Sequence, residues 1–126
     1  MSDIESSINL PRVNHEEIKT ICRQCYEKWG LFAQMDMVIE EMSELTKAIL
    51  KLRRMNGYTD IEKYNRLNEM LEEVVDVEFM LQQAKFVLLD MRGLDKEYAQ
   101  MWDIKIDKIK GLLADASYRE ESTGTT

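Results

Sequence analysis

The chain has 126 residues, of which 33% are charged, and its formal net charge at pH 7 is −7. Such a length predicts one domain with a modest core. The acidic balance disfavours a protein that holds nucleic-acid backbone, because that function needs a clustered basic surface. No apolar run approaches the roughly 20 residues of a membrane span, and residues 1–10 lack the regions of a signal peptide. We therefore expect a cytoplasmic protein that binds neither nucleic acid nor membranes.

The sequence pattern is helical almost from end to end, with no strand signal and no internal repeat. Glycines mark the breaks between the predicted helices. Gly30 follows the first apolar stripe, Asn56-Gly57 follows the second, and Gly93 follows the third. We expect an all-α, four-helix bundle-like domain. Its four helices should cover residues 14–29, 31–55, 59–89 and 95–113.

Two helix starts have the spacing of a capping box, in which the first residue and a glutamate three positions later cap each other's backbone N–H. They pair Asn14 with Glu17 and Thr59 with Glu62. The polar ends of the chain should be mobile. The expected organisation is a leader at 1–13, a domain at 14–113 and a tail at 114–126.

Two acidic pairs, Glu41 with Glu44 and Glu73 with Asp76, lie inside the second and third predicted helices. Residues three apart share a helical face, so each pair offers two carboxylates to one point in space. A hairpin of the two helices would bring four carboxylates together, which is costly unless a cation neutralises them. Hard oxygen ligands suit Mg²⁺ or Mn²⁺. The spacing therefore predicts a magnesium site built from two helices, with Mn²⁺ as a possible substitute.

The position of the pairs distinguishes them from the chance pairs of a chain with 24 acidic residues. Glu41 lies at the margin of the expected apolar stripe of its helix, so it should be partly buried. That stripe comprises Met35, Ile39, Met42, Leu45, Ile49 and Leu52, and the main stripe of the third helix comprises Leu67, Met70, Leu71, Val74, Val77 and Leu81. Glu73 and Asp76 lie on a line that continues into Met80, Ala84 and Val87. A solvated face does not usually continue into apolar residues.

The two motifs together resemble a known family. Residues 40–45, Glu-Glu-Met-Ser-Glu-Leu, and residues 72–77, Glu-Glu-Val-Val-Asp-Val, are similar to the Glu-Glu-x-x-Glu and Glu-x-x-Asp signature of the MazG-like all-α nucleoside triphosphate pyrophosphohydrolases. Trp29-Gly30 and Gln34 are similar to the residues that usually precede the first motif in that family. Lys105 and Lys108 resemble the basic residues of the last helix, so the likeness covers residues 15–112.

The resemblance implies Mg²⁺-dependent hydrolysis of a (deoxy)nucleoside triphosphate to the monophosphate and pyrophosphate, as in housekeeping of the nucleotide pool. The metal ligands would be Glu41, Glu44, Glu73 and Asp76. Glu40 and Glu72 would hold a further ion or accept the proton of the attacking water. Lys105 and Lys108 would contact the phosphates, unless they are ordinary solvated lysines. Trp29 and Gln34 would line the base pocket, with a core position as the alternative for Trp29.

Two other functions stay open. A relative in the same fold superfamily would hydrolyse phosphoribosyl-ATP, and a non-catalytic helical protein would keep the acidic face for a basic partner. The pair Cys22 and Cys25 invites a redox or zinc interpretation, but it lies about two turns into a helix and His15 is the only histidine. The absence of Glu-x-x-His also excludes a di-iron carboxylate bundle.

Self-association as a dimer or tetramer is expected from the third helix. Phe79, Phe86 and Leu89 lie away from its main stripe, so a single four-helix unit should not cover them all.

Overall fold

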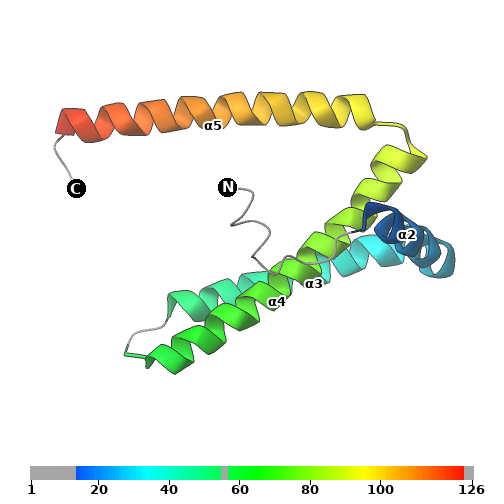
Figure 1. The fold of residues 1–126 in the computed structure, drawn as a ribbon, viewed down its shortest axis with the longest axis horizontal. Coiled ribbons are helices and arrows are strands. Elements are labelled where there is room, and N and C mark those ends of the chain that lie inside the picture. The colour runs from blue at the N-terminus through cyan, green and yellow to red at the C-terminus, as the bar shows by residue number, and fades with distance from the viewer. Residues whose placement is uncertain (1–13, 55–56, 124–126) are drawn as a thin grey trace, which may run out of the picture. The chain divides into compact units, whose positions relative to one another are not determined.

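The computed structural model describes residues 14–54 and 57–123, without the side chains of residues 117–123. The described part contains no strand, which confirms the all-α class. Its elements are the helices α2 (His15–Trp29), α3 (Leu31–Arg53), α4 (Asp60–Lys85) and α5 (Asp95–Thr123), with a π-helical turn η1 (Phe86–Met91) between α4 and α5 (Figure 1). Among these helices, none combines the length and the apolar character that a membrane crossing needs.

The helix boundaries follow local capping chemistry. The Asn14 Oδ1 accepts hydrogen bonds from the backbone N–H groups of Glu16 and Glu17, at 3.0 and 3.2 Å. Thr59 and Glu62 form the expected capping box, in which each side chain accepts from the other's backbone N–H at 3.2 Å. Gly30 separates α2 from α3 with a φ of 85°, a conformation that glycine adopts without steric cost.

Two boundaries differ from the prediction. The third predicted helix ends as α-helix at Lys85, and η1 follows with a widened turn in which the Arg92 N–H donates to the Val87 carbonyl at 3.0 Å. α5 continues past the expected end at residue 113 to Thr123, so residues 114–123 are helical. The predicted leader, residues 1–13, and the Asn56 cap lie outside the described residues.

The chain divides into two compact units, residues 1–86 and 87–126. In the first unit α3 and α4 run antiparallel side by side, and α2 packs against both of them (Figure 1). The second unit contains most of η1 and all of α5.

The α3–α4 interface repeats every three to four residues along both helices. Its buried or half-buried positions are Gln34, Val38, Glu41, Leu45, Ala48 and Leu52 on α3, and Met70, Glu73, Val77, Met80 and Ala84 on α4. We call this line of positions the seam. Such a spacing keeps one face of each helix against the other, as in antiparallel helix pairs generally. A glutamate therefore occupies the middle of the seam on each helix.

The apolar stripes expected from the sequence were partly wrong. Ile39 and Met42 on α3 are 64% and 51% exposed, and Leu67 and Leu71 on α4 are 52% and 59% exposed. A pair of helices covers only a narrow line on each member, and here that line runs through Gln34, Glu41 and Glu73. The more apolar faces of both helices are consequently open.

The core of the first unit lies where α2 joins the hairpin of α3 and α4. Its buried side chains there are Cys22, Gln34, Met80, Gln83 and Phe86. The Arg23 guanidinium carbon of α2 lies 5.7 Å from the centre of the ring of Phe86, the first residue of η1, so a cation–π contact joins α2 to the turn that follows α4.

Removal of the second capping box should destabilise the protein. Thr59→Ala leaves the Glu62 N–H without its side-chain acceptor, and we expect the free energy of unfolding to fall by about 1 kcal/mol. Thr20→Ala is the matched control, because the Thr20 hydroxyl donates only to the Glu16 carbonyl within an exposed helical turn. Urea denaturation followed by circular dichroism measures both. Equal effects of the two substitutions would contradict the capping role.

Candidate metal centre

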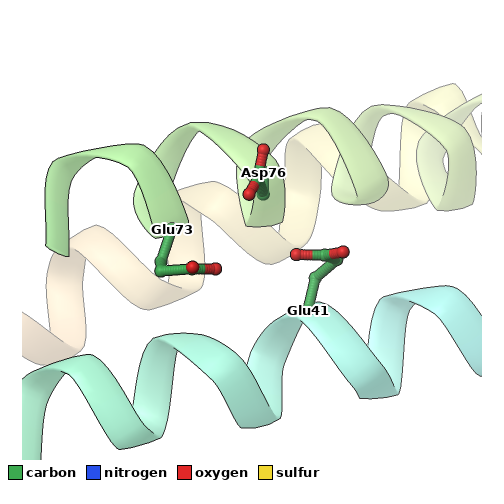
Figure 2. A group of neighbouring side chains, drawn as sticks. All are labelled: Glu41, Glu73 and Asp76. Carbon is green, nitrogen blue, oxygen red and sulfur yellow. The ribbon is translucent and has the colours of Figure 1, made fainter. Parts of the chain in front are cut away.

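Three carboxylates converge between α3 and α4. Glu41, Glu73 and Asp76 each place one carboxylate oxygen within 4.8 Å of the others. Figure 2 shows Glu41 projecting from α3 toward the two acidic side chains of α4. The hairpin therefore brings together three of the four predicted metal ligands, one from the first motif and two from the second.

Partial burial and mutual repulsion both act on the cluster. Burial, and then the negative charges of Asp76, Glu73, Glu40 and Glu44, raise the pKa of Glu41 above its ordinary value of 4.5. Burial and the charges of Asp76, Glu44 and Glu72 likewise raise the pKa of Glu73. Both causes disfavour the charged carboxylate, so a cation at this point would relieve an existing strain.

The donor set fits a small divalent cation. All three donors are hard oxygens, the kind that Mg²⁺ and Mn²⁺ prefer. Two oxygens on opposite sides of one Mg²⁺ lie about 4.2 Å apart, which is twice the bond length of about 2.1 Å. The three oxygens lie within 4.8 Å of one another, somewhat beyond that limit, so the carboxylates would have to move closer to share one ion.

An open pocket lies beside the carboxylates. It has a volume of about 380 Å³ and is lined by Glu41, Val75, Asp76, Phe79 and Met80. Two of its lining residues are acidic and three are apolar. The arrangement suits a ligand that has a phosphate–metal end and a flat or apolar end.

Glu44, the fourth predicted ligand, lies near the cluster but outside it. Its Oε1 accepts from the Lys47 Nζ at 3.3 Å, and both side chains are largely exposed. Its charge still acts on Glu41 and Glu73. An exposed ion pair of this kind is weak, so Glu44 can leave Lys47 for a cation at little cost.

Glu40 and Glu72, the predicted proton acceptors, are exposed. Each precedes a cluster residue by one position, which on a helix turns a side chain by about 100°. Their charges raise the pKa of Glu41 and Glu73 respectively. They therefore flank the carboxylate cluster without belonging to it.

The two residues predicted for the base pocket differ in their environment. Trp29 is 55% exposed, and the Lys28 Nζ lies 5.0 Å from the centre of its ring, so the core alternative for Trp29 is wrong. Gln34 is only 5% exposed and lies in the seam, two turns before Glu41. Neither residue lines the pocket beside the carboxylates.

Lys105 and Lys108 are exposed on α5, which belongs to the second unit. Lys105 lines a shallow pocket of about 400 Å³ together with Tyr98, Met101 and Trp102. The Tyr98 and Trp102 rings meet edge to face, with their centres 6.4 Å apart. The phosphate-binding role of the two lysines stays a prediction.

Cys22 is buried and Cys25 is half-buried, both on α2. His15 is exposed in the first turn of α2.

Sequence reasoning missed part of the pocket. Val75 and Phe79 line it although neither belongs to the line of Met80, Ala84 and Val87 that was expected beside the carboxylates. Met80 and Val87 on that line are buried, as predicted. Nothing in the sequence indicated that Gln83 is buried, because a glutamine inside a helix is ordinarily exposed.

In comparisons with protein-family models, curated proteins and solved structures, no match to this chain was found. The family assignment therefore stays a proposal that depends on the two motifs and the cluster they form.

The cluster predicts an unusual response to pH and metal. In chelator at pH 7, Glu73→Gln should melt at a higher temperature than the parent, because it removes a charge from a repulsive group. A raised pKa in the folded state means that the stability contributed by Glu73 is present below its ordinary value of 4.5 and is lost as the pH rises through the raised pKa. The difference between variant and parent should therefore shrink as the pH is lowered toward 4.5. Thermal melts monitored by circular dichroism measure it.

Added Mg²⁺ should raise the melting temperature of the parent more than that of Glu73→Gln, because binding to the folded state stabilises it. Glu78→Gln, an exposed glutamate of α4, is the control and should behave as the parent does. If Glu73→Gln matches the parent in chelator and responds equally to Mg²⁺, Glu73 does not belong to a metal centre.

Proposed function

We propose that the protein is a Mg²⁺-dependent nucleoside triphosphate pyrophosphohydrolase that releases the nucleoside monophosphate and pyrophosphate. The observation that supports this most is the convergence of Glu41, Glu73 and Asp76 between α3 and α4. A helix interface keeps carboxylates in its middle at a cost, which supports a functional reason for their presence. The resemblance of both motifs to the MazG-like family supplies the reaction and its cleavage point at the α-phosphorus.

In this proposal Glu41, Glu73 and Asp76 hold the cation, and Glu44 joins them by leaving Lys47. When bound, the metal neutralises the phosphates and makes a bound water more acidic. Glu40 and Glu72, which flank the cluster, are placed to accept a proton from water or to hold a further ion. The apolar lining of the pocket, formed by Val75, Phe79 and Met80, receives the nucleoside.

Such an enzyme would act on the nucleotide pool of the cytoplasm. Trp29 is exposed and therefore able to stack on a base, and Lys105 and Lys108 are candidates for phosphate contacts.

We also propose that two or more copies of the chain associate through the open faces of α3 and α4. The residues first expected at such an interface are not the exposed ones, since Phe86 is buried and Phe79 and Leu89 are half-buried. The exposed apolar side chains of the two helices instead include Ile39, Met42, Ile49, Leu67 and Leu71. Because the two helices meet through the seam, their more apolar faces need another cover.

Loss of a seam carboxylate should abolish turnover. With Mg²⁺ and a panel of common and modified nucleoside triphosphates, Glu41→Ala and Glu73→Ala should each lose at least about a hundredfold in kcat/KM, because each removes a ligand that the others cannot replace. Glu78→Ala should stay within about twofold. Chromatography of the products, with phosphoribosyl-ATP included, identifies the substrate class. Orthophosphate as the first product would refute attack at the α-phosphorus, and full activity of both variants would refute the site.

The exposed apolar faces of α3 and α4 lead us to expect a particle heavier than one chain in solution. Light scattering coupled to size exclusion should give at least two chains per particle at micromolar concentration. Leu71→Glu places a charge on the open face of α4 and should shift the mass toward one chain, whereas the exposed control Glu78→Ala should not. A parent of one chain would contradict the self-association.

A further inference from the structure

Gln83 is a buried polar side chain with an unused hydrogen-bonding atom. It is 4% exposed, and its Nε2 donates to the Met80 sulfur at 3.7 Å. Its Oε1 is buried and has no hydrogen-bond partner among the described residues. An unpaired buried acceptor destabilises the folded state, and such groups in native proteins usually have a water or a ligand as partner.

The position of Gln83 relates it to the carboxylate cluster. It lies two turns beyond Asp76 on nearly the same face of α4, and Met80 lies between them. Met80 lines the pocket that Glu41 and Asp76 also line, and it is the residue that holds the Gln83 Nε2. Met80 is therefore in contact with both the pocket and the Gln83 amide.

A second buried amide lies at the same level. α3 and α4 are antiparallel, and Glu41 lies opposite Glu73 and Asp76. Gln34 precedes Glu41 by two turns, and Gln83 follows Asp76 by two turns, so the two amides lie at the same level of the hairpin. Seven residues at 1.5 Å each separate this level from the carboxylates by about 10 Å. That span is comparable to the length of a nucleoside.

We propose that Gln83 recognises the base of the nucleotide, and that its Oε1 accepts a hydrogen bond from an N–H group on the base edge. This inference rests on the proposed function. A glutamine amide presents one acceptor and two donors, the groups with which proteins distinguish base edges. The Met80 contact occupies one Nε2 hydrogen and leaves the Oε1 for the ligand. Met80 has a flexible, unbranched side chain, so it can move aside when a base enters.

The test compares base preference in the parent with that in Gln83→Met, which keeps the length of the side chain and removes the amide. Pyrophosphate release is measured with Mg²⁺ and the ribo- and deoxynucleoside triphosphates of adenine, cytosine, guanine and uracil. For the best base of the parent, we expect kcat/KM to fall at least about tenfold through KM, because a site built to hydrogen-bond a substrate loses that contact. The ratio between best and worst base should shrink by a similar factor. Gln82→Met, one position earlier on α4, is the control and should keep both values within about twofold.

Each outcome of this experiment either supports or overturns the inference. If Gln83→Met melts higher than the parent and keeps the same base ratios, Gln83 is a core residue whose Oε1 is satisfied by water, and the inference fails while the enzyme assignment stands. Should the variant not fold, the parent alone still answers: equal kcat/KM for all bases overturns the inference, and at least a tenfold preference supports it. Release of pyrophosphate from no nucleotide would end the proposed function, and the inference with it.

Discussion

Two glutamates lie in the interface of an antiparallel helix pair, at positions where apolar side chains would hold the helices together most strongly. Glu41 and Glu73 face each other across the seam, and Asp76 joins them. Partial burial, and then the negative charges of neighbouring carboxylates with Asp76 first, raise the pKa of both glutamates, so the charged cluster opposes the packing that creates it. The packing of α3 on α4 must therefore be supported by the rest of the first unit.

That support comes from one end of the hairpin. The buried side chains of the first unit concentrate where α2 covers α3 and α4, and Arg23 of α2 lies over Phe86, the first residue of η1. The core at this end is small, and two of its members, Gln34 and Gln83, are amides. A core that contains two amides buries less apolar area than an apolar core would. It also places polar groups near the pocket that the carboxylates line. The proposed function is assigned to the carboxylates, and the further inference to one of the two amides.

The orientation of the two helices has a further consequence. Because their contact runs through the seam, the side chains of Ile39, Met42, Leu67 and Leu71 remain exposed. Large apolar faces of this kind are stable in water when another surface covers them. The proposed self-association and the candidate metal centre would therefore both follow from the same choice of covered face, because the carboxylates turn inward and the apolar side chains turn outward.

The sequence by itself determined the helices, several of their caps and the acidic pairs, because these depend on interactions within a few residues. The Thr59–Glu62 box, the break at Gly30 and the start of α5 at Asp95 follow from local chemistry alone. The approach of the second motif to the first also followed, because a short connection forces consecutive helices into a hairpin. Only the tertiary structure decided which face of each helix is covered, that Glu44 pairs with Lys47 outside the cluster, and that Gln83 is buried. Helical periodicity shows that a helix has an apolar face, but the face that becomes buried depends on which neighbours are present to cover it. In this chain the covered face is the one that contains the carboxylates.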